Sequence, residues 1–98
     1  MGKFVLIYTG GSMPESEEEG KRVMDAWMAW FGGLGESVLD GGNPFGASAA
    51  VGGGATSGLS GYSIVAADSL DDALAKAAGC PILDSASGGV EVYEALPM

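Results

Sequence analysis

Apolar residues occupy both alternating sets of positions in two short segments of the chain. Residues 3–9 read KFVLIYT and residues 62–67 read YSIVAA, so side chains on either side of an extended strand are mostly apolar. A strand with two apolar sides is typical of the middle of a sheet that is covered on both faces. We therefore predict a central strand at each segment.

A longer segment, residues 12–35, repeats its apolar residues at the spacing of a helix. One helix face would carry Val23, Trp27, Trp30, Phe31 and Leu34, with Met24 and Met28 beside it. Pro14 suits the first helical turn, and the glutamates that follow favour the positive end of the helix dipole. Gly32, Gly33 and Gly35 predict the end of this helix.

Residues 69–79 predict a second, shorter helix. Ser69 and Asp72 have the spacing of a capping box in which aspartate replaces glutamate. The apolar face would consist of Leu70, Ala73, Leu74, Ala77 and Ala78. Gly79 predicts the end of the helix, and Pro81 prevents its continuation.

The remaining segments are less regular. Residues 37–42 and 46–51 predict one interrupted strand or two short ones. Residues 52–61, GGGATSGLSG, predict a turn because they are rich in glycine and serine. Residues 89–95 predict a last strand whose alternating valines face the core.

The order of these elements is β-α-β-β-α-β, the ferredoxin-like α+β arrangement. We expect a four-stranded antiparallel sheet with the first and third strands in the middle and both helices on one face. No predicted helix remains for the second face, and a second copy of the same sheet is its simplest cover. We therefore predict one domain over residues 1–98 that pairs with itself as a dimeric α+β barrel.

The charge balance narrows the expected partners. Thirteen acidic and four basic residues give a net charge of −9, which repels nucleic acid and anionic membranes. The apolar run FVLIY at residues 4–8 is shorter than an export-signal core or a membrane span. Cys80 is the single cysteine, so no internal disulfide forms. We expect a cytoplasmic protein that binds neither nucleic acid nor membrane.

Three segments together resemble the YCII-related family, which comprises the YciI-like and DGPF-domain proteins. They are LDGGNPFG at residues 39–46, SGYSIVAADSLDDALAKAAGCPIL at residues 60–83 and GGVEVYEA at residues 88–95. The most specific part runs from Gly61 to Pro81, and the resemblance extends over nearly the whole chain. It implies the ferredoxin-like fold and the dimeric α+β barrel.

The resemblance also implies a type of chemistry. The wider superfamily includes muconolactone-isomerase-like enzymes, small monooxygenases and many members without an assigned activity. A small cyclic or acidic organic molecule, bound or transformed by isomerase-type or lyase-type proton transfer without a cofactor, is therefore expected. Some members carry a histidine on the first helix that works with an aspartate. This chain has no histidine, and that position falls near Asp25. The DGPF motif is also absent, with GNPFG in that part of the chain, so a histidine base is not carried over.

Asp40 is the candidate catalytic residue, in the corner that follows the first helix. Glycines beside it let a ligand approach the backbone, and its carboxylate could accept a proton from a carbon or a hydroxyl. Asp40 equally fits a turn in which its side chain binds the backbone two residues further on. Asn43 has the same two interpretations, as a substrate contact or as the start of an Asn-Pro turn.

Two further residues are candidate substrate contacts. Tyr8 ends a central strand, where it either presents its hydroxyl to a pocket or packs in the core with that hydroxyl satisfied. Asp25 is a proton-transfer candidate if it faces the sheet, but its spacing favours the solvated side of the helix. Cys80 is expected to be a buried apolar residue rather than a nucleophile, because it lies at a helix C-terminus, where the dipole disfavours the thiolate. No metal or cofactor is expected, because the chain lacks histidine and phosphate-binding glycine motifs.

Two functions remain open from the sequence. One is a small-molecule enzyme with Asp40 as the base, and the other is a non-catalytic homodimer that binds a small ligand or a protein partner. The missing histidine favours the second, and the fold relatives favour the first. A closed apolar cavity on which Asp40 and a tyrosine converge would favour catalysis. A cavity filled by Trp27, Trp30 and Met28 would exclude it, and the two tryptophans are expected in the core and dimer contacts.

Overall fold

The computed structural model describes residues 2–11, 15–53 and 58–97. Within these residues the fold is α+β, with a four-stranded antiparallel sheet and two α-helices. The strands are β1 (Gly2–Thr9), β2 (Val38–Asp40), β3 (Leu59–Ala67) and β4 (Gly89–Ala95). The helices are α1 (Glu17–Leu34) and α2 (Leu70–Ala77), and two short 3₁₀ helices are η1 (Gly35–Ser37) and η2 (Pro81–Asp84).

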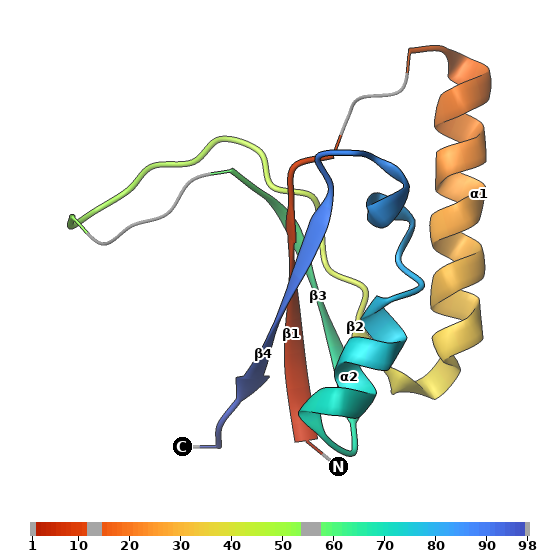
Figure 1. Ribbon diagram of the computed structural model, residues 1–98. Helices are drawn as coiled ribbons and strands as arrows, with labels where there is room; N and C mark the ends of the chain where they lie inside the picture. The colour runs from red at the N-terminus through yellow and green to blue at the C-terminus, as the bar shows by residue number, and fades with distance from the viewer. Residues whose placement is uncertain (1, 12–14, 54–57, 98) are drawn as a thin grey trace.

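The sheet has the strand order β2-β3-β1-β4, and each neighbouring pair runs antiparallel. Strands β1 and β3 therefore lie in the middle, as their two apolar sides predict. Both α1 and α2 lie on one face of the sheet, with α1 as a long outer element beside it (Figure 1). The α+β class, the antiparallel four-stranded sheet and its two central strands are confirmed.

The core lies between the sheet and the helices. Phe4, Leu6 and Tyr8 point into it from alternate positions of β1. On β3, Val65 stands opposite Phe4, and Ser63 stands opposite Leu6. Partly buried residues that pack against this layer are Trp27, Trp30, Leu34, Ile82, Val90 and Val92. The inward-facing valines of the last strand thus lie where the sequence pattern predicts. The helix stripe is confirmed only in part, because Trp27, Trp30 and Leu34 pack against the core whereas Val23 is 41% exposed.

Serine residues cap the start of both helices. The Ser16 hydroxyl accepts a hydrogen bond from the backbone N–H of Glu19 at 3.1 Å. The Ser69 hydroxyl accepts one from the backbone N–H of Asp72 at 3.1 Å, which confirms the predicted cap. The Asp72 carboxylate in turn accepts from the backbone N–H just ahead of Ser69. The predicted place of Pro14 in the first helical turn lies outside the described residues.

The end of α1 differs from the prediction. The helix continues through Gly32 and Gly33, and only Gly35 ends it, with a φ of 56°. Glycine in a helix interior costs about 1 kcal/mol, which neighbouring contacts can offset. One such contact is made by Trp30, whose indole N–H donates to the Lys76 carbonyl at 3.0 Å and joins the two helices.

Helix α2 buries a narrower face than the sequence predicts. Ala73 and Ala77 are buried, but Leu70 and Leu74 are 49% and 47% exposed. Ala78, also expected on the apolar face, caps the helix and is exposed. The small side chains of Ala73 and Ala77 therefore form the contact with the core, and Leu70 and Leu74 are not part of it.

The chain between β2 and β3 also differs from the prediction. Strand β2 has three residues, and residues 46–51 form no strand. An isolated bridge between Pro44 and Gly61 holds the chain to β3. The backbone N–H of Phe45 donates to the Ser60 carbonyl at 2.8 Å beside this bridge. Strand β3 begins at Leu59, inside the predicted turn. Residues 54–57 of that turn lie outside the described part of the chain.

The face of the sheet opposite the helices carries apolar side chains. Val5 pairs with Ile64, and Ile7 pairs with Tyr62, across the two central strands. Neither α1 nor α2 covers this face (Figure 1). Residues 45–53 leave the sheet on the same side and run away from it. We refer to Val5, Ile7 and Ile64 as the open face.

Candidate ligand-binding site

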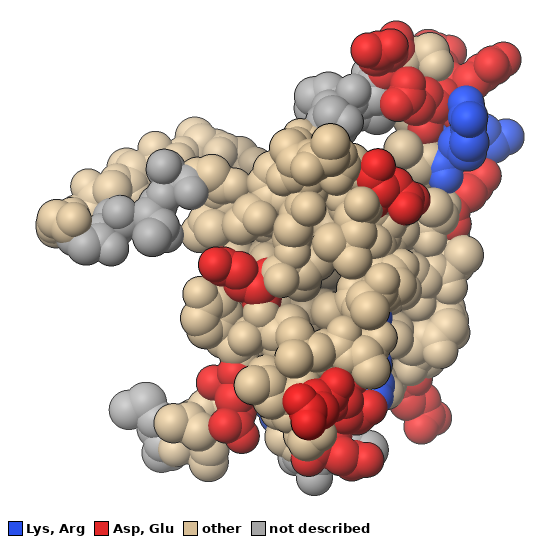
Figure 2. Space-filling view, in the orientation of Figure 1, with Lys and Arg blue, Asp and Glu red and all other residues tan. Residues whose placement is uncertain are grey.

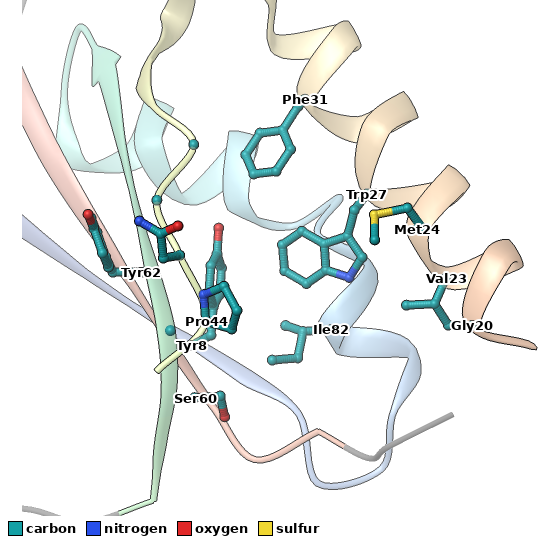
Figure 3. Close-up of a pocket in the computed structure, with 14 residues that line it drawn as sticks. Tyr8, Gly20, Val23, Met24, Trp27, Phe31, Pro44, Ser60, Tyr62 and Ile82 are labelled. Carbon is teal, nitrogen blue, oxygen red and sulfur yellow. The ribbon is translucent and has the colours of Figure 1, made fainter. Parts of the chain in front are cut away.

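A cavity of about 440 Å³ lies between α1 and the turn that follows β2. We call residues Gly41, Gly42, Asn43 and Pro44 the 41–44 corner. The wall on α1 consists of Gly20, Val23, Met24, Trp27 and Phe31, and the 41–44 corner forms the wall facing it. The rest of the lining comes from Tyr8, Ser60, Gly61, Tyr62 and Ile82. Figure 3 shows the rings of Trp27 and Phe31 directed from α1 toward the strands.

The cavity arises because large side chains on one wall face small ones on the other. The Trp27 ring meets Tyr8 edge-on, with a centroid distance of 5.1 Å and an interplanar angle of 82°. Phe31 lies tilted against Trp27 at 5.9 Å. These rings hold α1 away from the sheet, and the glycines of the 41–44 corner have no side chains with which to fill the gap. The lining therefore leaves a space that a ring-shaped molecule can enter.

Two glycines allow the 41–44 corner to pass close over β3. Gly42 has a φ of 74°, and a Cβ at this position would collide with the Tyr62 carbonyl oxygen. A Cβ on Gly61 would lie 2.9 Å from the carbonyl oxygen of Asn43. The backbone N–H of Tyr62 donates to this same Asn43 carbonyl at 3.3 Å. The glycines at these two positions are therefore required by the close packing of the corner against the strand.

A chain of two hydrogen bonds joins the central strands to the corner. The Tyr8 hydroxyl donates to the Ser63 hydroxyl oxygen at 2.7 Å. The Ser63 hydroxyl donates to the Gly41 carbonyl oxygen, also at 2.7 Å. Ser63 is fully buried, so both of its bonds satisfy a polar group inside the core. This chain fixes the ring of Tyr8 and the position of the 41–44 corner relative to each other.

Burial keeps two titratable side chains neutral. It raises the pKa of Tyr8 to about 12, an effect larger than the opposing one of the hydrogen bond with Ser63. Burial also raises the pKa of the Cys80 thiol to about 11. Near neutral pH Tyr8 therefore keeps its proton, and Cys80 is a thiol rather than a thiolate. Cys80 is buried in the core, as the sequence predicts.

The structure separates the two predicted residues of the corner. Asn43 lines the cavity, whereas Asp40 does not. The Asp40 carboxylate accepts a hydrogen bond from the backbone N–H of Gly42 at 2.8 Å, which is the turn considered as its alternative role. Asp40 is exposed, and its carboxylate stabilises the bend that Gly42 makes.

The other predicted residues also divide between the cavity and the surface. Tyr8 is 5% exposed and lines the cavity, with its hydroxyl satisfied by Ser63. Asp25 is exposed on α1 and is not part of the lining, in agreement with the solvated alternative. Of the three residues whose filling of the cavity would have excluded catalysis, Trp30 and Met28 lie outside the lining, and Trp27 forms part of it.

Most residues of the site were not predicted from the sequence, and three of them show why. Trp27 was assigned to the core and dimer contacts, but one side of its ring is part of the cavity wall. Ser63 carried a signal that was overlooked, since it is a polar residue in phase with the buried Val65. Ile82 carried no signal, because η2 was not predicted and its apolar side chain follows no period.

None of the described residues that line the cavity is charged. Acidic side chains gather instead around the N-terminal ends of α1 and α2 (Figure 2). A second hollow of about 340 Å³ adjoins the cavity between α1 and η2, and it does carry charged residues, namely Glu19, Arg22 and Asp84. The first cavity is thus an uncharged site in a strongly acidic protein.

No family model, curated protein or solved structure matches the chain. The resemblance to the YCII-related family therefore stays a prediction. Within residues 2–11, 15–53 and 58–97, no helix is long and apolar enough to cross a membrane. Nor do three or more His, Cys, Asp or Glu side chains of this described part form a group that could hold a metal ion. The function is accordingly argued from the cavity.

Proposed function

We propose that the protein binds a small, largely apolar organic molecule in the cavity between α1 and the 41–44 corner. The observation that carries this proposal is the cavity itself, about 440 Å³ in volume and lined by aromatic rings without charged groups. Pockets of roughly 300–1,000 Å³ with mostly apolar walls and a few polar groups are typical of small-molecule sites. Asn43, Tyr8, Ser60 and Tyr62 supply the polar side chains here.

Binding without catalysis is the function that the lining supports best. A general base works best when its pKa lies near the working pH. The pKa of Tyr8 is about 12, and the lining contains no carboxylate, thiol or amine side chain. Asp40, the base expected for an isomerase or lyase, is bound to the backbone of Gly42 outside the cavity. These features support a ligand-binding role over proton transfer.

We further propose that two copies pair through their open faces as a ferredoxin-like, dimeric α+β barrel of the YCII-related type, in the cytoplasm. The strand order β2-β3-β1-β4 and the helices on one face support this assembly. Val5, Ile7 and Ile64 give the open face an apolar centre whose burial would stabilise the pair. Val5, Ile7 and Ile64 do not line the cavity, so pairing through these residues leaves the ligand site of each copy in place.

A thermal-shift screen against neutral and acidic ring compounds tests the ligand proposal. A ligand present at 100 times its Kd stabilises the folded state by about 2.7 kcal/mol, which raises the Tm of a domain of this size by roughly 10 °C or more. The protein offers a matched pair of variants. Met24 and Met28 are four residues apart on α1 and are 61% and 66% exposed, but only Met24 lines the cavity.

The expected pattern separates binding from catalysis. Met24→Ala should weaken a hit, and Met28→Ala should leave it unchanged. Asp40→Asn should also leave binding and any turnover unchanged, because an asparagine oxygen can still accept the hydrogen bond from Gly42. Turnover of a bound compound that Asp40→Asn abolishes would restore the enzyme interpretation. A hit that responds equally to both methionine variants would place the ligand elsewhere.

A further inference from the structure

We propose that the cavity selects neutral aromatic molecules that carry an O–H or N–H donor, with the Tyr8 hydroxyl oxygen as the acceptor. This inference rests on the proposed function, since it names the class of ligand for the same cavity. It depends on the direction of the hydrogen bonds beneath the cavity, on the absence of charge around it and on the geometry of its rings.

The direction of the hydrogen bonds follows from the atoms present. A backbone carbonyl only accepts, so the single hydroxyl hydrogen of Ser63 is used by the Gly41 oxygen. Ser63 then has no hydrogen left for Tyr8, and the bond between the two hydroxyls requires Tyr8 to donate. The Tyr8 oxygen therefore has only lone pairs to offer. A ligand that bonds to it must bring its own hydrogen.

Burial keeps this arrangement fixed over the working pH range. Ser63 is 0% exposed, so water does not compete for its bonds with Tyr8 and Gly41. Tyr8 lines the cavity, and its ring meets the Trp27 ring, which Figure 3 shows projecting from α1 toward the strands. The Tyr8 hydroxyl therefore directs its hydrogen toward Ser63 on β3 and presents its lone pairs to the cavity.

The charge pattern excludes ionic ligands. An anion would find no lysine or arginine among the lining residues, in a chain whose net charge is −9. A cation would find no carboxylate in the lining to replace its hydration. Neutral molecules avoid both desolvation costs, because the aromatic walls supply dispersion contacts without a charge partner.

The ring geometry favours a flat ligand. Tyr8 and Trp27 meet edge to face, at 82°, and Trp27 and Phe31 are inclined by 38°. A planar guest can add to such a cluster by an offset-stacked or edge-to-face contact of the same kind. Asn43 provides a second polar contact at the opposite wall, and no side-chain hydrogen bond of Asn43 exists among the described residues. Its amide can both donate and accept.

Three naphthalene probes test the inference by titration calorimetry. 2-Naphthol is neutral and has a donor, 2-methoxynaphthalene is neutral without one, and 2-naphthoate is an anion with the same ring system. We expect 2-naphthol to bind about tenfold more tightly than 2-methoxynaphthalene, the factor typical of one neutral hydrogen bond. 2-Naphthoate should bind most weakly of the three.

Two variants test whether the hydrogen bonds that join Tyr8, Ser63 and Gly41 determine the selectivity. Tyr8→Phe removes the acceptor, so the ratio of the Kd values of the two neutral probes should fall to about one. Ser63→Ala frees the Tyr8 hydrogen, so Tyr8 becomes a donor toward the cavity and the ratio should shift in favour of 2-methoxynaphthalene. Met28→Ala, outside the lining, should retain the wild-type ratio. If Ser63→Ala does not fold, Tyr8→Phe still decides the point, because it keeps the shape of the ring.

The outcomes distinguish the selectivity from the site. Equal binding of the two neutral probes to the wild-type protein, or a ratio that Tyr8→Phe leaves unchanged, overturns the selectivity and leaves the cavity as a binding site. Tight binding of 2-naphthoate overturns the exclusion of anions. Failure of all three probes to bind overturns the proposed ligand site together with the selectivity.

Discussion

The Tyr8 hydroxyl donates to the Ser63 hydroxyl at 2.7 Å, although the two residues are 55 positions apart in the chain. Their bond crosses the two central strands, β1 and β3, inside the core. The Ser63 hydroxyl in turn donates to the Gly41 carbonyl oxygen. The position of the 41–44 corner, one wall of the cavity, therefore depends on two buried hydroxyl groups. Stability and the proposed ligand selectivity therefore depend on the same two side chains.

The two ends of this bond should differ in their effect on stability. Ser63→Ala leaves the buried Tyr8 hydroxyl without an acceptor and the Gly41 carbonyl without a donor, and we expect a loss of about 1–3 kcal/mol. Tyr8→Phe should cost only about 1 kcal/mol, because Ser63 keeps its bond to Gly41. Urea unfolding of both variants measures the difference. If both variants lose the same free energy of unfolding, the hydrogen bond from Ser63 to Gly41 does not contribute to stability.

Alkaline pH should destabilise the protein through two buried acids. The folded-state pKa values of Cys80 and Tyr8 are about 11 and about 12, raised from 9.0 and 10.0 by burial. Because burial favours the protonated forms, their contributions are complete below the unfolded-state pKa values. They are lost as the pH rises, from 9.0 to about 11 for Cys80 and from 10.0 to about 12 for Tyr8. Each loss is at most roughly 2–3 kcal/mol.

Urea midpoints measured from about pH 8 to about pH 11 test this dependence. Cys80→Ala should remove the earlier part of the decline, because alanine does not titrate. Tyr8→Phe should remove the later part. A wild-type midpoint that stays constant over this range would contradict the burial of both groups.

Neighbouring glycines in the 41–44 corner should respond very differently to alanine. Gly42→Ala places a side chain at a φ of 74° and against the Tyr62 carbonyl, so a loss of more than about 2 kcal/mol is expected. Gly41→Ala meets no atom within 4 Å and should change stability by less than about 1 kcal/mol. Thermal unfolding of the two variants provides the comparison. If both are tolerated, the corner can move away from β3 without cost.

The sequence predicted the features that nearby residues decide. Apolar residues on both sides of residues 3–9 predicted that β1 lies in the middle of the sheet, and the strand order confirms it. The Ser69 cap was predictable for a similar reason, since its donor, the N–H of Asp72, lies three positions away. Such short-range features need no knowledge of the rest of the fold.

The candidate site was harder to predict, because its parts come from distant segments. The hydrogen bond between Tyr8 and Ser63 depends on the register of two strands, which no local pattern reveals. The direction of the Asp40 carboxylate depends on the backbone of Gly42, which turns the N–H toward it. A sequence can therefore indicate that the corner is important without showing which of its side chains faces the cavity.

The proposed dimer makes a prediction about the open face. Light scattering on a size-exclusion peak should give twice the 9.8 kDa mass of one chain at micromolar concentration. Ile64→Lys should reduce this mass to that of the single chain, because a two-fold interface brings both new charges into an apolar contact. Leu74→Lys is the matched control, since Leu74 lies on α2, on the other side of the sheet, and is already half exposed.

The three masses together identify the interface. A wild-type protein that elutes as a single chain would contradict the dimer. A dimer that persists in Ile64→Lys would keep the assembly but place its contact elsewhere than Val5, Ile7 and Ile64. Dissociation by Leu74→Lys as well would show that added positive charge acts on the whole acidic molecule rather than on the open face. Only a loss confined to Ile64→Lys supports pairing of the two sheets, because that residue faces away from the helices and the ligand cavity.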